Sequence, residues 1–370
     1  MENKLITLAI HTFQKAQIIK TLLESEGIEV YLHNVNLISP MVSSGVRIRI
    51  KECDLPAALK IIEKTTLYKE EKSRKTGKTQ SGKILIPVDF SNYSLQACEL
   101  GFHYAGEIQA EITVMHVHFM PVFPPSFPKN DSFPYPAAGV SEEENQILIN
   151  KAQKDLEQLA ESIREKIRTG AWPDIPFSTV FQEGLPEEEI VAFSRKEAVS
   201  LIIMGTRGKN RKDADLIGSV TAEVIEMTKI PVLAIPEKTS IRNFSDIRRI
   251  AFGTSFDPND LLSFDTLFKM FRAREYYLFH ITHKQDAWNE VKLADIKNYF
   301  TGQYPGIKIQ CDILDAHDFI LDLERFIRDN KMDIIAIPTH KRNMFARMFN
   351  PSVARKMLFH TDTPLLALRF

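Results

Sequence analysis

The sequence predicts an α/β protein in which two parallel-sheet domains of one fold follow a small α+β unit. Three observations support this fold class. Short apolar runs alternate with helical patterns along residues 82–238, as in a parallel sheet covered on both faces. The same order of runs returns over residues 246–370, which predicts a second domain of the same fold. Residues 1–67 have a shorter pattern of their own.

The composition excludes several functional classes. With 44% hydrophobic and 26% charged residues over 370 positions, the chain has the balance of an ordinary globular protein with room for two or three domains. Lys and Arg number 47 against 48 Asp and Glu, so no net charge drives binding to nucleic acid or to a membrane. No apolar run approaches the roughly 18 residues of a membrane helix, and Met1–Lys4 does not begin a signal peptide. We therefore expect a cytoplasmic protein that binds neither nucleic acid nor membrane.

The cysteines and histidines predict neither a disulfide nor a metal site. Cys53, Cys98 and Cys311 lie far apart and form no C-x-x-C motif, so we expect buried free thiols. His116 and His118 are two residues apart on an apolar run, so both side chains can face one side of a strand. They have no cysteine or carboxylate at ligand spacing, and we expect no bound metal.

Residues 1–67 have the pattern of a small α+β unit. Strands are predicted at residues 5–10, 28–32 and 46–50. A helical pattern between the first two strands stops at Gly27, and residues 54–63 predict a second helix. The next residues, 68–81, are charged and lack large apolar side chains, which predicts a flexible linker.

Residues 82–238 alternate strand and helix. Strands are predicted at residues 84–88, 113–117, 177–181, 201–204 and 231–235. Helices are predicted after Ser91, at 142–168, at 187–195 and after Gly218. The segment Phe119–Gly139 contains six prolines and several aromatic residues, so we expect an irregular loop laid over the domain surface.

One stretch, Leu201–Pro236, carries the strongest functional signal. Its first apolar strand is followed by Gly205, Gly208, Gly218 and Ser219, in the spacing G-2x-G-9x-G-S, and then by a helical pattern. A strand, a glycine loop and a helix N-terminus form the architecture that holds an anion. Glycine lets the backbone approach a phosphate, and the first amides of the helix point at it. The hydroxyl of Ser219 can cap the helix or bind a phosphate oxygen.

Simpler interpretations of these residues remain open. The three glycines can be turn residues of a loop that binds nothing. Asp89, at the end of the first strand, can merely cap the following helix. The basic residues of the loop can form a solvated surface, and Asp213 and Asp215 partly cancel their positive charge. These basic residues are Arg207, Lys209, Arg211 and Lys212.

The glycine spacing resembles the nucleotide motif of ATP-binding universal stress proteins. The run Ile84–Ser91 is similar to the opening strand of that family, whose aspartate reaches the nucleotide, and Thr113–Val117 is similar to its second strand. The resemblance covers most of residues 82–238. It implies a universal-stress-protein-like domain of the adenine nucleotide alpha hydrolase-like fold.

The resemblance implies that ATP is the ligand of this domain. Asp89 and main-chain groups of Val88 and Val117 would hold the adenosine, and the glycine frame would surround the phosphates. The candidate nucleotide-binding residues are Pro87, Val88, Asp89, Val117, Met204, Gly205, Arg207, Gly208, Gly218, Ser219 and Val220. Lys209 lies in the loop but outside the glycine frame. Magnesium with the nucleotide is an open alternative, because no acidic pair is clearly assigned to it.

The second copy of the pattern has lost this chemistry. Its offset from the first is 166 residues at the first strand and 133 at the loop. The counterparts of the three motif glycines are Pro338, Lys341 and Pro351. Asp89 corresponds to Ser255, and only Ser219 keeps a serine, Ser352. A basic cluster in this segment either attracts an anion or is a solvated loop; it consists of His340, Lys341, Arg342 and Arg347.

The family resemblance also suggests why a degenerate copy is kept. Universal stress proteins commonly dimerise by pairing their last strands, and residues 231–235 and 364–368 are short apolar strands that need edge partners. We expect these two strands to pair within the chain as a pseudo-dimer with one live site.

The leading hypothesis is therefore an ATP-binding regulatory protein rather than an enzyme. The P-loop pattern is absent, although slow ATP hydrolysis is not excluded. The N-terminal unit resembles, around Leu22–Ile28, a small bacterial domain labelled only as a signal-transducing module, which suggests that it senses either an unidentified protein partner or a ligand. The rival hypothesis is a scaffold that binds no nucleotide and recruits a protein or an apolar ligand.

Overall fold

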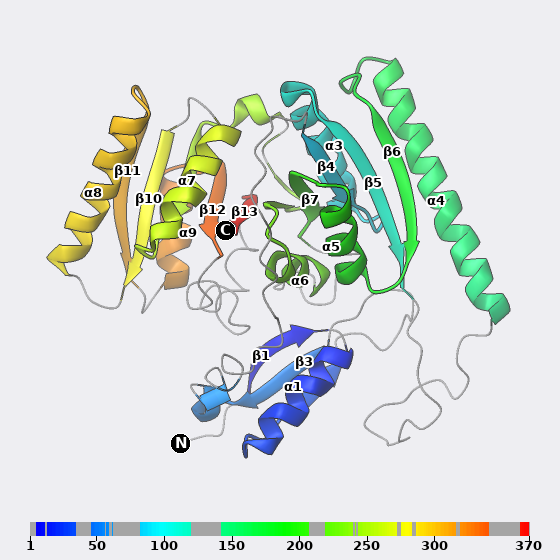
Figure 1. Cartoon of the computed structure of the whole chain (residues 1–370), viewed down its shortest axis with the longest axis horizontal. Coiled ribbons are helices and arrows are strands. Elements are labelled where there is room, and N and C mark those ends of the chain that lie inside the picture. Colours follow the sequence, from blue (N-terminus) through cyan, green and yellow to red (C-terminus); the bar gives the residue numbers. More distant parts are fainter. Residues whose placement is uncertain are drawn as a thin grey trace.

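The structure is a computed structural model of the whole chain (Figure 1). It describes residues 5–11, 13–34, 46–55, 57–58, 61, 82–119, 142–206, 219–239, 241, 243–271, 275–282, 286–315, 319–339 and 363–369. The predicted linker at 68–81 and nearly all of the proline-rich segment lie outside these residues. So do the second-copy residues 340–352.

The N-terminal unit is a three-stranded antiparallel sheet packed against helix α1, and its described residues 55, 57–58 and 61, within the second predicted helix, are helical as well. Its elements are β1 (Leu5–His11), α1 (Phe13–Ser25), β2 (Tyr31–Asn34), β3 (Val46–Lys51) and the 3-10 turn η1 (Glu52–Asp54), with strand order β1-β3-β2. Ala16 and Leu23 of α1 and Ile48 and Ile50 of β3 belong to one fully buried core. The helix ends as predicted, because Gly27 adopts a positive φ of 82°, which favours glycine.

The second predicted strand begins later than expected. β2 starts at Tyr31, whereas residues 28–30 are irregular although Ile28 and Val30 are buried. Apolar character at these positions therefore reflects packing under the sheet and not strand pairing. This difference leaves the predicted α+β unit unchanged.

The rest of the chain forms one ten-stranded sheet (Figure 1). The first half consists of β4 (Lys83–Pro87), α3 (Asn92–Ile108), β5 (Glu111–His118), α4 (Glu142–Arg168), β6 (Phe177–Glu183), α5 (Pro186–Lys196), β7 (Leu201–Gly205), α6 (Ser219–Met227) and β8 (Val232–Ile235). The second half consists of η2 (Phe244–Asp246), β9 (Arg249–Gly253), α7 (Pro258–Met270), β10 (Glu275–Thr282), α8 (Ala287–Gln303), β11 (Lys308–Asp315), α9 (Phe319–Asp329), β12 (Ile334–Pro338) and β13 (Leu365–Leu368).

The strand order is β11-β10-β9-β12-β13-β8-β7-β4-β5-β6. All neighbours are parallel except β13 and β8, which pair antiparallel at the centre. Two parallel halves therefore meet at their last strands, which is the edge pairing that the sequence predicts. Because this pairing is internal, both short apolar strands lose their exposed edge.

The two halves repeat the same hydrogen bonds at the predicted offset. The amide of Thr206 donates to Ile235 O at 2.9 Å, and the amide of Thr339 donates to Leu368 O at 2.7 Å. Both members of the second pair lie 133 residues after the first. The predicted α/β fold with two like sheet domains is therefore confirmed.

Helices cover both faces of the sheet, as expected for parallel strands. Ile84 and Ile86 point to the core under α3, α4, α7 and α8, and Leu85 points to the core under α5, α6 and α9. Each core includes residues of both halves, so the sheet is one continuous body. Within the described residues, no helix is both long and apolar enough to cross a bilayer.

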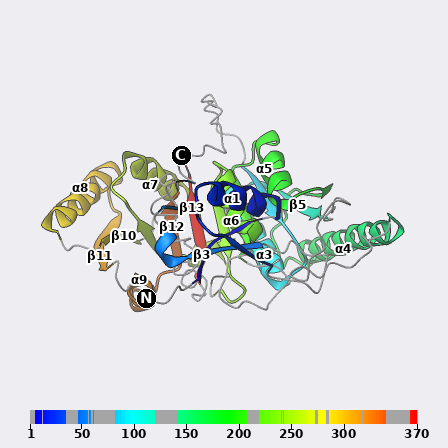
Figure 2. The same ribbon diagram turned by 90° about the horizontal axis from the view of Figure 1, so that it is seen from below.

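The N-terminal unit lies beside the middle of this body. β1 contacts α6, and both views place the small sheet next to that helix (Figures 1 and 2). In Figure 1 the strands β5 and β10 point toward the same side as this unit.

Candidate functional site

The predicted residues of the first half gather at one edge of the sheet. In the order β8-β7-β4-β5-β6, the chain runs from β4 outward to β5 and β6 and then crosses back to β7. After their carboxyl ends, β4 connects to β5 on one side and β7 connects to β8 on the other. The crevice between two strands whose connections diverge in this way is where open α/β sheets bind ligands. The predicted residues at the ends of β4, β5 and β7 are Pro87, Val88, Asp89, Val117, Met204 and Gly205.

Asp89 is held in a tight turn between β4 and α3. Its Oδ1 accepts hydrogen bonds from Ser91 N at 3.1 Å and from Ser91 Oγ at 2.6 Å. Ser91 is in turn the N-cap of α3 and accepts from Ser94 N at 3.3 Å. Asp89 therefore supports the start of the helix only through Ser91, which is the N-cap in place of the Asp89 cap of the simpler interpretation. Asp89 is also half-buried at the crevice, and a carboxylate has about four acceptor positions, so capping and ligand binding are compatible.

The main chain of Val88 is already bonded within the protein. Its amide donates to Met115 O at 2.8 Å, and its carbonyl lies 2.8 Å from His116 Nδ1. Val117 differs. It lies two residues beyond Met115 on β5, so its main-chain groups point toward β4 as those of Met115 do, but the β4–β5 pairing ends at Met115. Of the two predicted main-chain contacts, Val117 is therefore better placed to meet a ligand.

Gly205 is required by packing at the end of β7. A Cβ there would lie 2.7 Å from Tyr93 Cβ, 2.8 Å from Tyr93 C and 3.0 Å from Ser94 N. The first turn of α3 therefore sits directly against this glycine. The Gly205 carbonyl accepts from Thr221 Oγ1 at 2.8 Å, which ties β7 to the start of α6.

The phosphate side of the predicted site is described only in part. Ser219 and Val220 are the first residues of α6, and Val220 is half-buried. Through Thr221 these residues lie close to Gly205. Arg207, Gly208 and Gly218 lie outside the described residues, as does Lys209.

Two residues that build this edge carry no signal for this role in the sequence pattern. Thr221 and His116 join segments far apart in the chain, through hydrogen bonds to Gly205 and Val88. Ser91 and Ser94 instead form local hydrogen bonds with Asp89. A Ser or Thr at the start of a helical pattern is the nearest sequence signal for Ser91.

The second half repeats the turn with its carboxylate moved. Ser255 stands at the position of Asp89, as predicted, and Asp260 stands at the position of Ser94. Asp260 Oδ2 accepts from Thr254 Oγ1 at 2.7 Å, from Ser255 N at 2.9 Å and from Asp257 N at 3.1 Å. Asp260 is only 2% exposed, so this carboxylate accepts hydrogen bonds from groups of its own turn.

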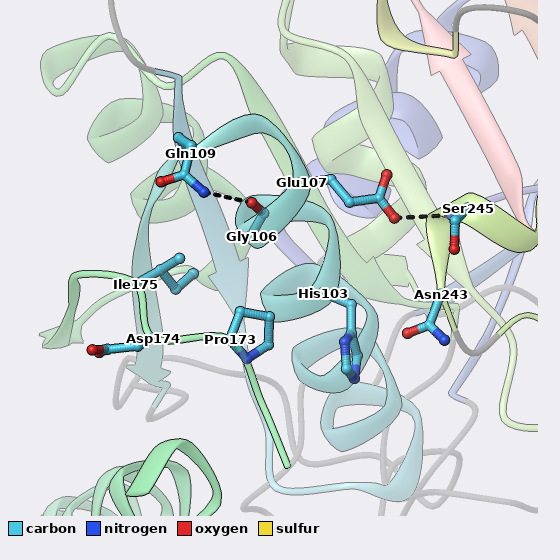
Figure 3. Close-up of a pocket in the computed structure, with 9 residues that line it drawn as sticks. All are labelled: His103, Gly106, Glu107, Gln109, Pro173, Asp174, Ile175, Asn243 and Ser245. Carbon is cyan, nitrogen blue, oxygen red and sulfur yellow. Dashed lines mark hydrogen bonds between the residues drawn. The ribbon is translucent and has the colours of Figure 1, made fainter. Parts of the chain in front are cut away.

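A separate cavity of about 410 Å³ lies at the other end of α3 (Figure 3). Its lining consists of His103, Gly106, Glu107, Gln109, Pro173, Asp174, Ile175, Asn243 and Ser245. Glu107 Oε1 accepts from Ser245 N at 2.9 Å, which connects α3 to the segment that leads into the second half. At 1.5 Å per residue, the α3 residues of this lining lie roughly 17–26 Å beyond the start of the helix next to Asp89. The cavity is therefore distinct from the crevice at β4 and β7.

The described residues contain no group of three or more His, Cys, Asp or Glu placed to hold a metal ion. His116 and His118 do face one side, since both rings lie near Phe181, at centroid distances of 5.9 and 6.3 Å. The expectation of buried thiols is right for Cys98 but wrong for Cys53 and Cys311, which are exposed. Those two lie at a turn and on the outermost strand β11, where one side of the chain faces water.

The chain resembles known proteins over two of its segments. Residues 81–236 match the model of the universal stress protein family. Residues 13–66 match a family described as "Putative prokaryotic signal transducing protein".

Two sequence relatives and one solved structure extend this match. A universal stress protein of Methanocaldococcus jannaschii is 31% identical over 161 residues, which are 44% of this chain and 85% of that protein. A second one from the same organism is 31% identical over 170 residues, which are 43% of this chain and 96% of that protein. A crystal structure of a universal stress protein from Archaeoglobus fulgidus covers 78% of this chain and 97% of its own at a TM-score of 0.56 and 18% identity, which shows a shared fold. The chain thus belongs to the universal stress protein family, and the segment that matches the second family model precedes its first sheet domain.

Proposed function

We propose that this protein is an ATP-binding regulatory protein with one nucleotide site, in the first half of the sheet. The observation that carries the proposal is the meeting of Asp89, Val117, Gly205 and the start of α6 at the switch point between β4 and β7. The half that contains this crevice is also the half that matches the family model. The carboxylate of Asp89 suits a ribose hydroxyl, and the first amides of α6 suit a phosphate.

The second half would bind no nucleotide. Its carboxylate Asp260 is buried and bonded to the turn, whereas Ser255 at the crevice position carries no charge. The β8–β13 pairing would then replace a dimer of two single-domain chains by an internal one, with one bound ATP per chain.

Calorimetric titration of the full chain with ATP, with and without Mg²⁺, tests the proposal. The decisive variant is Asp89→Asn, because the amide oxygen still accepts from Ser91 while the charge is removed. Hydrogen bonds to a charged group contribute about 1.5–3 kcal/mol, so we expect affinity to fall roughly 10-fold to 100-fold. The matched control is Ser255→Ala in the second half, which should leave ATP affinity unchanged.

Two outcomes would replace this proposal. If the purified protein releases no adenine nucleotide on denaturation and shows no calorimetric binding of ATP, it is a scaffold that recruits a protein or an apolar ligand. If phosphate release continues over many turnovers and stops in Asp89→Asn, the protein is a slow ATPase.

The N-terminal unit would carry the output of the site. β1 contacts α6, and α6 begins with the residues proposed to meet the phosphates. A change in the ordering of α6 would therefore reach the small sheet directly, and a protein partner of that sheet would sense it. The cytoplasmic location expected from the composition is part of the same proposal.

A further inference from the structure

One imidazole holds both neighbours of Asp89. His116 Nδ1 lies 2.8 Å from the carbonyl oxygen of Val88, and the His116 ring lies 4.6 Å from the ring of Phe90. A carbonyl oxygen only accepts hydrogen bonds, so Nδ1 carries the proton and donates it. The residue before Asp89 is thus bonded to β5, and the residue after it packs on the same side chain.

The turn needs such support, because Phe90 has a φ of 60°. The left-handed region is unfavourable for a residue with a side chain, because Cβ comes too close to the following carbonyl oxygen. The ring contact with His116 and the hydrogen bond to Val88 offset that cost. Together they fix the direction in which the side chain of Asp89 leaves the backbone.

The second half contains the same arrangement around a different residue. His280 Nδ1 lies 2.8 Å from Thr254 O, the rings of His280 and Phe256 are 4.1 Å apart, and Phe256 has a φ of 63°. Burial lowers the pKa of His280, which favours the neutral ring with a single N–H donor. The residue held here is Ser255, which has no carboxylate to present.

We infer that His116 is a positioning residue of the proposed nucleotide site: it holds Val88 and Phe90 so that the Asp89 carboxylate faces the crevice. The inference rests on the proposed ATP site and adds a residue that makes no assigned ligand contact. The geometry of the turn is kept in both halves, but only in the first half does it aim a carboxylate. His280 therefore offers a control within the same molecule.

The test compares His116→Leu with His280→Leu in the full chain. Both substitutions remove one imidazole and one hydrogen bond to a main-chain carbonyl, so similar losses of stability are expected in denaturant unfolding. ATP affinity, measured by calorimetry, should fall roughly fivefold to tenfold in His116→Leu, since one hydrogen bond contributes about 1 kcal/mol. It should stay unchanged in His280→Leu. His116→Asn keeps an N–H donor and should recover most of the affinity.

A second matched pair covers the case in which His116→Leu does not fold. Phe90→Leu and Phe256→Leu keep an apolar side chain but remove the ring contact. Only Phe90→Leu should lower ATP affinity, by roughly two- to threefold, which is the size of effect expected from losing one aromatic contact. Equal ATP affinities in wild type and in folded His116→Leu, or equal losses in both members of a pair, would overturn the positioning role alone. Failure of the wild type to bind ATP would overturn the nucleotide site itself.

Discussion

Leu366 in β13 lies opposite Leu233 in β8, and both side chains are fully buried where the two halves of the sheet meet. Truncation of a buried leucine to alanine costs about 2–5 kcal/mol, because apolar contacts are lost and a cavity remains. We expect Leu366→Ala to lower the free energy of unfolding by about 3 kcal/mol. Chemical denaturation of the full chain measures this loss.

A matched control for this prediction is Leu262→Ala on α7, where the side chain is 54% exposed. An exposed substitution of this kind changes stability by no more than about 0.5 kcal/mol. Equal effects of the two substitutions would show that the central strand pair does not hold the halves together.

Gly205 and Gly302 should respond to alanine with opposite signs. In Gly205→Ala the new Cβ would meet Tyr93 and the backbone of α3 at distances below 3 Å, so we expect a loss of about 1–3 kcal/mol and weaker ATP binding. Gly302 lies in α8 with nothing within 4 Å of the new Cβ, and alanine there should raise stability by about 0.5 kcal/mol. Thermal unfolding of both variants measures these changes. A Gly205→Ala variant as stable as the wild type would contradict the packing argument.

The two carboxylates of the repeated turn should differ in their structural role. Asp260→Ala leaves three donors without their acceptor, the buried hydroxyl of Thr254 and the partly buried amides of Ser255 and Asp257, so we expect a cost of about 3 kcal/mol and no effect on ATP affinity. Asp89→Ala removes an acceptor that is half-exposed and that water can replace, so its cost should be about 1 kcal/mol, together with loss of ATP affinity. Unfolding free energy and ATP affinity should be measured for both variants. An equal loss of ATP affinity in Asp260→Ala and Asp89→Ala would refute the proposed difference between the two carboxylates.

Thiol reactivity should separate the three cysteines. Burial raises the pKa of Cys98 to about 12, so the folded protein keeps this thiol protonated. A thiol of the unfolded chain ionises near pH 8.5, so the stability that Cys98 contributes is complete below about pH 8.5 and is lost as pH rises toward its folded pKa. At pH 8 a thiol reagent should modify Cys53 first and Cys311 more slowly, because partial burial raises the pKa of Cys311. Cys98 should react only after unfolding, and modification of all three at one rate in the native protein would contradict its burial.

ATP should protect the N-terminal sheet from hydrogen exchange if nucleotide binding orders the start of α6. β1 contacts α6, so ordering of the start of α6 should slow exchange of amides in Leu5–His11. Hydrogen exchange followed by mass spectrometry measures this, and β11 at the far edge of the sheet serves as an internal control. Equal exchange in β1 with and without ATP, in a protein shown to bind it, would disconnect the N-terminal unit from the site.

The order of elements could be predicted because it rests on local periodicity. Apolar runs and helical patterns placed a strand at 201–204, observed as β7 (Leu201–Gly205), and a helix at 142–168, observed as α4 (Glu142–Arg168). Burial of single residues could not be predicted in the same way. Cys311 is expected to be a buried thiol, but it lies exposed on the outermost strand, where one side is solvent.

The candidate site shows the same division. The position of Asp89 after an apolar strand was sufficient to place it at a carboxyl edge. Its support by His116 and the move of the carboxylate to Asp260 in the second half depend on contacts between separate strands and helices. No spacing within one segment predicts such contacts.

By itself, the sequence determined the alternation of strands and helices, the doubled pattern and the residues that can form an anion loop, because these follow from side-chain period and glycine placement along a short stretch of chain. The tertiary structure alone decided that Leu366 lies opposite Leu233 where the halves meet, that α3 occupies the space beside Gly205, and that His116 bonds to the carbonyl of Val88. The physical reason is that each of these depends on excluded volume and hydrogen bonds between segments far apart in the chain, which exist only once the sheet has formed.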